Sequence, residues 1–515
     1  MRMKVTMLAA LLLGMAVVQG CASLPPRPVQ ADSLALAAAT GTPLDTALAP
    51  VQAAHPGESG FRLVPNGVEA FALRGFSARA AGRSLDVQYY IWHNDLTGRL
   101  LARELLRAAD RGVRVRVLLD DLDARANNLA LAGLDAHPNI EVRLFNPFAS
   151  RSGSVSKSTE MVTRLSRMNH RMHNKAWIAD NRIAIAGGRN IGDEYFGASE
   201  NVNFLDTDFV MLGPAVQALS ASFDSYWNSA AVWPVAVLSP KQVNDATLAK
   251  LRVAADDVTR QAAASAWVQA LAGTDAVKRI QAGDIEFHWA SVWQVLSDDP
   301  MKSQLGESLI ERSAVLRGFR EAMRESKTSI TLVSPYFVPG KQGSAGLVDL
   351  AKRGRSVSIL TNSLAANDVA AVHGGYSRYR DALLDGGVLL WELKPDTGQQ
   401  TGSSLFGSSG ASLHSKSAIF DNDSIFVGSF NLDPRSVSLN CELGILVNDP
   451  ALAAELAALF ARVTSGERAW RVDHDDAGKL RWSDGTQTLH REPGASLPRR
   501  ATAKLFRWLP FDSQL

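Results

Sequence analysis

The chain has 515 residues, of which 46% are hydrophobic and 21% charged, and its formal net charge is only +2. This length predicts two or three domains, and the composition excludes general disorder. The nearly balanced charge argues against a dedicated nucleic-acid-binding protein, which would have a strong basic excess.

The N-terminus has the pattern of an export signal. Arg2 and Lys4 precede a mostly apolar run of 14 residues, 5–18, which is too short for a comfortable membrane-spanning helix and typical of a signal peptide. We therefore predict a signal peptide over residues 1–20. The run ends in V-Q-G-C, which resembles the bacterial lipobox and implies that Cys21 is lipidated. An ordinary secretory signal or an uncleaved anchor is the alternative.

The residues after the signal fit a protein held on a membrane. By the same resemblance to lipoproteins, Ala22 after the cysteine implies the outer rather than the inner membrane, in the bacterial cell envelope and facing the periplasm. Several acyl chains together would hold the protein firmly to a bilayer. Cys441 is the only other cysteine, so lipidation of Cys21 leaves no pair for an intramolecular disulfide. We predict that residues 21–58 form a tether that lifts the folded body off the membrane.

Residues 59–232 read as a first α/β domain. A buried strand is expected at 85–92, a helix at 99–110, and further strands at 113–119 and 140–146. Arg111-Gly112 is the expected C-terminal stop of the helix, because glycine readily adopts the left-handed conformation found there. A helix over 215–227 closes this domain, and residues 233–304 are predicted to be a connector or insert.

Residues 305–466 repeat the same order of elements. Strands are expected at 330–337, 356–360 and 388–394, and a helix at 345–352, which again ends at Arg-Gly. Strands alternating with helices in both halves predict βαβ units and mixed sheets with helices on their faces. Residues 467–515 are predicted to be a hairpin and a tail; residues 504–509 of the tail could rest on a membrane surface or pack on the body.

The two halves carry one pattern of reactive side chains, H-x-K-x4-D-x6-G-[GS]-x-N, 241 residues apart. Its members are His173, Lys175, Asp180, Gly187-Gly188 and Asn190 in the first half and His414, Lys416, Asp421, Gly428-Ser429 and Asn431 in the second. Two histidines and two lysines are what phosphodiester chemistry without a metal needs: one imidazole attacks phosphorus, the other protonates the leaving oxygen, and cationic and amide groups hold the phosphoryl oxygens. We place the histidine and lysine of each motif two apart on a strand, with both side chains on one face.

A carboxylate follows each motif. Counting back from Pro214 and Pro450 pairs Asp206 with Glu442. We expect each of them to orient the histidine of its own half and to stabilise the imidazolium, as the acid of a catalytic triad does. Asp120-Asp121 and Asp298-Asp299 look like metal-binding pairs in isolation, but a strand-end turn and a loop are the better interpretations. His170 is expected at the surface or at a strand edge.

The duplicated motif is the signature of the phospholipase D superfamily, which residues 60–465 resemble. Within it the chain is similar to C-type bacterial cardiolipin synthases, on the segments 85–92, 141–148, 172–175, 187–196 and 509–515. The resemblance implies an α/β fold of two fused phospholipase D-like α-β-α sandwich halves, related by a pseudo-twofold axis and sharing one active site.

The resemblance also implies roles for the motif residues. One of His173 and His414 forms a phosphohistidine, with His173 the more common choice in the superfamily, and the other acts as general acid and then as general base. Lys175, Lys416, Asn190, Ser429 and Asn431 bind the phosphoryl group, and Asp206 and Glu442 stand behind the histidines. Asp180 and Asp421 complete the catalytic motifs but are expected to be structural. Gly188 departs from the full signature, which has serine there. No cofactor or metal is implied.

The expected function is phosphatidyl transfer between membrane phospholipids, as in a cardiolipin synthase. Hydrolysis of the same intermediate, which would give phosphatidic acid, is the alternative, and a nuclease fits the charge and the membrane anchor less well. An envelope scaffold without activity would require both motifs to be idle. The expected partners are phospholipids in a bilayer, without nucleic acid.

Overall fold

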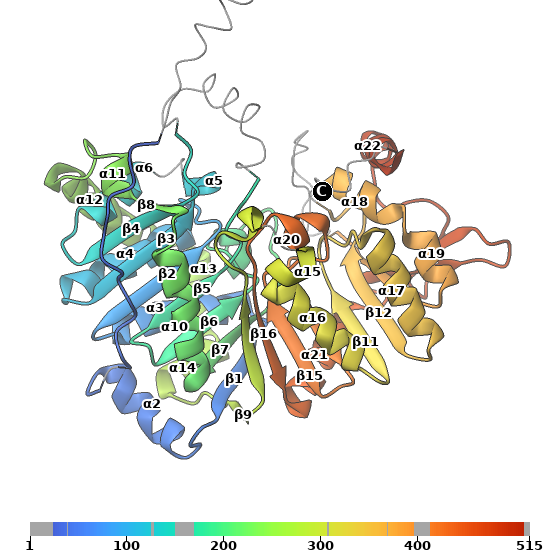
Figure 1. Cartoon of the computed structure of the whole chain (residues 1–515), viewed down its shortest axis with the longest axis horizontal. Helices are drawn as coiled ribbons and strands as arrows, with labels where there is room; N and C mark the ends of the chain where they lie inside the picture. The colour runs from blue at the N-terminus through green and yellow to red at the C-terminus, as the bar shows by residue number, and fades with distance from the viewer. Residues whose placement is uncertain are drawn as a thin grey trace, which may run out of the picture.

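The computed structural model describes residues 24–38, 40–124, 128–149, 169–305, 308–367, 369–395 and 413–508. Two α/β halves stand side by side, each built on one mixed β-sheet (Figure 1). The predicted signal peptide, Cys21 and the segment 509–515 lie outside the described residues.

The first sheet has the strand order β8-β4-β3-β2-β5-β6-β7-β1-β9. Neighbours β2, β3 and β4 run parallel, and the remaining pairs are antiparallel. Its strands are β1 (Ser59–Val64), β2 (Ser84–Tyr89), β3 (Arg114–Asp120), β4 (Ile140–Phe145), β5 (Ala176–Ala179), β6 (Ile183–Gly187), β7 (Asp208–Leu212), β8 (Val232–Pro234) and β9 (His288–Ala290).

The second sheet has the order β10-β16-β15-β14-β11-β12-β13-β17-β18-β19 and repeats the central topology of the first. Here β11, β12 and β13 are the parallel strands. Its strands are β10 (Trp293–Ser297), β11 (Ser329–Val333), β12 (Ser356–Asn362), β13 (Leu389–Leu393), β14 (Ser417–Phe420), β15 (Ser424–Gly428), β16 (Leu443–Asn448), β17 (Ala469–His474), β18 (Leu480–Ser483) and β19 (Thr488–Leu489).

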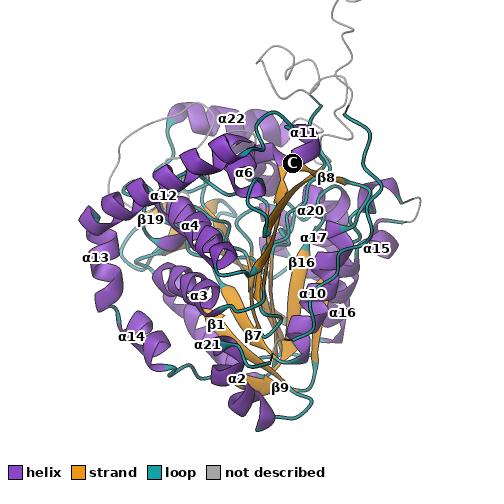
Figure 2. Cartoon of the chain, turned by 90° about the vertical axis from the view of Figure 1, so that its left-hand side faces the viewer, coloured by secondary structure: helices purple, strands orange, loops and turns teal. Residues whose placement is uncertain are grey.

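Helices cover the outer face of each sheet and fill the space between the sheets. Figure 2 shows α3, α4, α6 and α12 on the outer face of the first half. The helices of the first half are α2 (Pro43–Ala53), α3 (Gly67–Ala80), α4 (Leu96–Asp110), α5 (Asp121–Ala124), α6 (Asn128–Asp135), α9 (Asp193–Phe196) and α10 (Pro214–Trp227). Those of the second half are α15 (Leu309–Arg312), α16 (Ala314–Glu325), α17 (Gly340–Lys352), α18 (Ala370–Ser377), α19 (Arg380–Asp385), α20 (Pro434–Ser438), α21 (Pro450–Val463) and α22 (Leu497–Trp508).

The predicted repeat of βαβ units is confirmed, and its helix stops have the expected geometry. Helix α4 begins at Asp95, whose side chain accepts from the backbone N–H of Gly98. After α4 and α17 the chain turns at Gly112 and Gly354, whose φ angles are +92° and +86°. Only glycine adopts these values at little cost, which is why both helices end there.

One hydrophobic core belongs to both halves. It contains Phe145, Ile178 and Phe209 from the first sheet together with Ile425 and Ile445 from the second, all buried. Helix α10 contacts β10 of the second sheet, and α21 contacts β1 of the first. Because neither half can bury this surface alone, the halves form one body whose relative orientation is fixed by packing.

The predicted connector contributes to both sheets. It contains α11 (Val235–Leu238), α12 (Asp245–Ala264), α13 (Ala266–Gly273) and α14 (Asp275–Ala282), then β9 and β10 and a short 3-10 turn (Lys302–Gln304). Strand β9 pairs with β1, and β10 pairs with β16. The chain therefore crosses from one sheet to the other between Ala290 and Trp293.

The segment predicted as a free tether is largely attached to the body. The main chain of residues 24–38 is bonded along the first half: the carbonyl of Pro25 accepts from the indole of Trp233, and that of Ser33 accepts from Arg116. The spacer prediction is therefore wrong for residues 24–38, because buried polar side chains of the first half find their partners in this segment. Within the described residues no helix is long and apolar enough to cross a membrane.

Candidate active site

Both motif histidines lie at one end of the two sheets, which we call the site end. The parallel strands β2–β4 and β11–β13 finish there, and β5 and β14, which run antiparallel to β2 and β11, begin there. His173 and Lys175 precede β5, and His414 and Lys416 precede β14, so the prediction that these residues lie within a strand is wrong. They are extended residues that lead into the strands.

Equivalent side chains at the ends of β3 and β12 hold the two histidine segments. Asp120 Oδ2 accepts from the backbone N–H of Met172 at 2.9 Å. Asn362, 242 residues later, accepts from the N–H of Leu413 and donates to its carbonyl. Met172 and Leu413 each stand directly before a histidine, so both histidines are positioned from a neighbouring parallel strand.

Each histidine segment is also paired with the opposite half. Met172 forms a parallel bridge with Cys441, and the N–H of His173 donates to the carbonyl of Cys441 at 2.8 Å. Leu205 and Leu413 form the corresponding bridge, and the N–H of His414 donates to the carbonyl of Leu205. The residue that follows each bridge partner is a carboxylate.

The carboxylates are therefore exchanged between the halves. Nδ1 of His173 lies 2.9 Å from Oε2 of Glu442, and Nδ1 of His414 lies 2.6 Å from Oδ2 of Asp206. The prediction that each acid serves the histidine of its own half is wrong. The physical reason is the backbone pairing across the pseudo-twofold axis, which sequence spacing within one half does not contain.

These contacts define the proton positions on the imidazoles. An ionised carboxylate only accepts, so Nδ1 carries the hydrogen and Nε2 presents its lone pair. Burial, opposed by Glu442, lowers the pKa of His173 to about 4, and burial together with Lys416 lowers the pKa of His414 to about 3. At neutral pH both rings are neutral, and either Nε2 could act as a nucleophile.

The lysines are buried beside the histidines. Nζ of Lys175 donates to the carbonyl of His173 at 2.5 Å, and Nζ of Lys416 donates to that of His414. Burial lowers the pKa of Lys175 to about 7; Glu442 opposes this shift and Lys416 adds to it. An arriving phosphodiester anion would favour the charged form of Lys175, which burial otherwise disfavours.

Two of the remaining predicted phosphate ligands, Asn190 and Ser429, already have protein partners. Asn190 donates to the hydroxyl of Tyr195 and accepts from the N–H of Ile91. The Ser429 hydroxyl donates to Glu442 at 2.5 Å and accepts from the N–H of Leu443. Oδ1 of Asn431 is buried without a hydrogen-bond partner among the described residues. The Ser429 hydroxyl thus positions a carboxylate in this structure.

The same geometry explains why glycine replaces serine in the first motif. A Cβ at Gly188 would lie 2.2 Å from Oδ1 of Asp206. Asp206 is one methylene shorter than Glu442, so it must approach more closely to reach its histidine. Gly188 with Asp206 and Ser429 with Glu442 are therefore two matched pairs.

The motif aspartates lie at the other end of β5 and β14, away from the histidines. Asp180 accepts from the backbone N–H groups of Gly82, Arg83 and Ser84. Asp421 accepts in the same way from Lys327, Thr328 and Ser329, and these bonds hold the pKa of its carboxyl well below the usual range although burial opposes the shift. Both residues therefore fix the turn that enters the first parallel strand, which agrees with the expected structural role.

Aromatic side chains pack against both histidines, and the sequence did not lead us to expect them. Tyr90 packs edge-on against His173, with ring centroids 5.0 Å apart. Tyr195 meets His414 in the same way, and Phe204 stacks on it. Tyr90 follows the last residue of β2, and this place at the end of a parallel strand could have indicated it as a site residue. No feature of the sequence indicated Phe204.

Two other predictions concern residues near the site. Asp298 lies in the loop after β10, as expected, and its carboxylate contacts Lys302 and the N–H of Glu442. His170 is buried between the carbonyls of Leu439 and Pro300, so its expected surface position is wrong. Both residues support the segment that carries Glu442.

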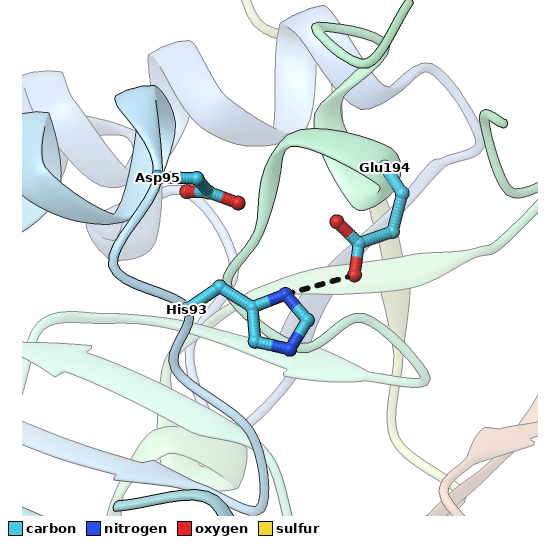
Figure 3. Close-up of side chains that lie close together, drawn as sticks. All are labelled: His93, Asp95 and Glu194. Carbon is cyan, nitrogen blue, oxygen red and sulfur yellow. Dashed lines mark ion pairs between the residues drawn. The ribbon is translucent and has the colours of Figure 1, made fainter. Parts of the chain in front are cut away.

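A second cluster with a histidine lies beyond Tyr90 and is explained by local structure (Figure 3). Nδ1 of His93 is 3.1 Å from Oε1 of Glu194, and this hydrogen bond raises the pKa of His93 to about 9. Asp95 accepts from the N–H groups of Gly98 and Asp193 and so begins α4 and α9. His93 and Glu194 therefore form an ion pair, and Asp95 beside them stabilises the starts of two helices.

Two histidine–lysine pairs from related halves, with exchanged carboxylates and neutral imidazoles, define an enzyme of the phospholipase D type. A protein-family model described as "Cardiolipin synthase, PLD-like domain" matches residues 77–227 and 319–464, one match in each half. The chain belongs to this family.

Known relatives match over most of the chain. The chain is 38% identical to cardiolipin synthase C of Escherichia coli strain K12, covering 91% of this chain and 99% of that protein. It is 27% identical to cardiolipin synthase A of Pseudomonas syringae, covering 78% of this chain and 67% of the relative. The crystal structure of a Haemophilus influenzae phosphatidylserine synthase matches with a TM-score of 0.57 and 14% identity, over 87% of this chain and 92% of that one; this likeness concerns the fold alone.

Proposed function

We propose that the protein transfers a phosphatidyl group from one phospholipid to a hydroxyl group of phosphatidylglycerol, producing cardiolipin through a phosphohistidine. The main observation in support of this reaction is the pair of neutral imidazoles, each with its Nδ1 hydrogen-bonded to the carboxylate of the opposite half. The names of the relatives support this choice of substrate.

In the first step Nε2 of His173 attacks phosphorus, and the bond from phosphorus to the head-group oxygen breaks. The leaving oxygen takes a proton from Nε2 of His414, which binds that proton when the anionic phosphodiester enters. Asp206 stabilises the imidazolium of His414, and Glu442 stabilises the positive charge that develops on His173. The choice of His173 as nucleophile follows the more common use of the N-terminal histidine in the superfamily.

In the second step neutral His414 takes the proton of the acceptor hydroxyl, and the resulting oxygen attacks phosphorus and displaces His173. The lysines neutralise the phosphoryl oxygens in both steps. Each step conserves protons between the same two imidazoles, so the donor's alcohol is released and cardiolipin is formed without a cofactor. Water in place of the acceptor would give phosphatidic acid.

We further propose that Cys21 carries lipid and that the enzyme faces the periplasm, with the outer membrane favoured by Ala22. The support is the lipobox-like V-Q-G-C sequence at the end of the signal segment. A shared bilayer would concentrate enzyme and substrate on one surface.

The test supplies the full-length protein with labelled phosphatidylglycerol and phosphatidylethanolamine in vesicles, with and without EDTA. Labelled cardiolipin as the main product supports transfer, whereas phosphatidic acid alone contradicts it. Turnover should be unchanged by EDTA, since no step uses a metal. Wild-type turnover in His173→Ala or His414→Ala would contradict the site assignment.

A further inference from the structure

Helix α22 exposes its leucines to solvent, whereas an ordinary surface helix buries its apolar side chains. Leu497 is 79% exposed and Leu505 58% exposed, and Ala501 between them is also exposed. Residues four apart lie on one face of a helix, so the three form an apolar stripe that points into solvent. A surface helix normally buries such a stripe.

Two arginines of α22, Arg499 and Arg500, face the body of the protein instead. Arg499 donates to the carbonyls of Leu364 and Asn367, and Arg500 donates to that of Glu492. Between the helices α18 and α22 lie mainly small residues: a Cβ at Gly374 would be 2.6 Å from the carbonyl of Ala503. The helix is thus held by arginine–carbonyl bonds and close backbone contact, which leaves its leucines free to face outward.

This stripe lies at the site end. Leu364 and Asn367 are in the loop that leaves the site end of β12, and Figure 1 shows α22 on the same side of the molecule as α5 and α18. Two further exposed apolar side chains belong to this end: Leu122, on α5 directly after β3, and Val369, directly before α18. Exposed apolar side chains from three segments, α5, the residue before α18, and α22, therefore lie at the end of the sheets that carries the histidines.

The N-terminal segment starts at the same end. Pro25 is bonded to Trp233 of β8, whose neighbour Val232 pairs with Phe145 at the site end of β4. Only two residues lie between Cys21 and Leu24, and the three steps from one Cα to the next correspond to at most about 11 Å of extended chain. An anchor at Cys21 would hold this end, and not the opposite one, against the membrane.

We propose that α22 is a membrane-docking helix: its outward stripe of Leu497, Ala501 and Leu505 enters the leaflet of a phospholipid bilayer that the protein faces, and it turns the active site toward the lipid. Lys504, which is exposed beside the stripe, would meet the phosphate groups. This inference rests on the proposed function, because a bilayer is the expected occupant only if the substrates are phospholipids.

The test places an environment-sensitive fluorophore on Leu505→Cys in the full-length protein, reconstituted in vesicles that contain lipids brominated along the acyl chain. Labelling is selective because Cys441 is buried and Cys21, the only other cysteine, would be blocked by its lipid. Val292→Cys is the matched control: it is 64% exposed and adjoins β10 at the opposite end of the second sheet. We expect strong quenching at position 505 and none at position 292.

A second variant separates docking from catalysis. Leu497→Asp with Leu505→Asp should lower turnover of vesicle phospholipid about tenfold, since two apolar insertions are lost. Turnover of a short-chain phosphodiester dissolved as monomers should stay unchanged. Equal quenching at positions 505 and 292, or unchanged vesicle turnover in the double variant, overturns the docking proposal.

The remaining outcomes separate the two proposals. Quenching at position 505 in a protein that converts no phospholipid supports the docking face and contradicts the proposed function. Cardiolipin formation without quenching at position 505 supports the proposed function and contradicts the docking face. A fluorophore at position 505 that is shielded without vesicles, in a protein that elutes as a dimer, would show that a second copy covers the stripe and would overturn membrane docking.

Discussion

The exchange of carboxylates between the halves predicts which variants behave alike. Asp206→Asn should reproduce the defect of His414→Ala, and Glu442→Gln that of His173→Ala. The amide of asparagine can donate to Nδ1 of His414, which would shift the ring hydrogen to Nε2 and remove the lone pair that serves as general base.

The expected loss is large because the contact is short and buried. Nδ1 of His414 lies 2.6 Å from Asp206, and Asp206 is only 2% exposed. Opposite charges with centres about 4 Å apart attract by about 4 kcal/mol at an effective dielectric constant of 20. Losing that stabilisation of the imidazolium corresponds to about 10³-fold in rate.

The assay uses a phosphatidyl ester of p-nitrophenol, whose leaving group needs no general acid. Loss of the general acid/base then leaves the attack on phosphorus intact, and one equivalent of nitrophenolate is released in a burst before turnover slows. Loss of the nucleophile abolishes the burst. The two histidine variants first establish which histidine is the nucleophile and which is the general acid/base. Asp180→Asn, far from the histidines, is the control.

We expect Asp206→Asn to share the burst behaviour of His414→Ala, whichever histidine proves to be the nucleophile. If Asp206→Asn instead matched His173→Ala, and Glu442→Gln matched His414→Ala, the exchanged arrangement would be refuted.

Three further predictions concern single features of the site. The kcat/KM of the wild type should fall as the pH rises through about 7, because Lys175 then loses its proton. In Lys175→Arg the fall in kcat/KM should occur at a higher pH, because arginine keeps its proton; an unchanged pH profile would exclude Lys175 as the cause of the fall. Gly188→Ser should cost at least about 100-fold in kcat/KM, because the new Cβ meets Asp206 at 2.2 Å. In the control Ser429→Gly the loss should be about tenfold, and Glu at position 206 beside the new serine should restore part of the activity; equal losses in the two single variants would contradict the matched pairs. Asp180→Ala should lower the free energy of unfolding by about 2–3 kcal/mol, since three backbone donors lose their acceptor; denaturant unfolding measures this, and a large loss of kcat in the folded variant would contradict a structural role.

The duplicated frame was predictable because its signals are local. Alternation of strands and helices, Arg-Gly at two helix ends and the two motifs are properties of short segments, and β3, α4, β12 and α17 lie close to their predicted ranges. The motif aspartates were also expected to pair away from phosphorus, and their backbone contacts agree, since both stand beyond the apolar run that continues each motif.

Contacts between distant segments were not predictable in the same way. Glu442 is 269 residues from His173, and Asp206 is 208 residues from His414. Counting within one half pairs each acid with the nearer histidine, and nothing in that spacing reveals which backbone segments bridge across the axis. The attachment of residues 24–38 and the outward turn of α22 were missed for the same reason.

The sequence by itself determined the two halves, the reactive groups and the class of chemistry, because these follow from residue types at fixed local spacing. Only the tertiary structure decided that each imidazole takes its carboxylate from the other half, and that Gly188 makes room for one of them. The physical reason is the shared core: packing the two sheets against each other sets the bridges at Met172–Cys441 and Leu205–Leu413, and those bridges choose the partners.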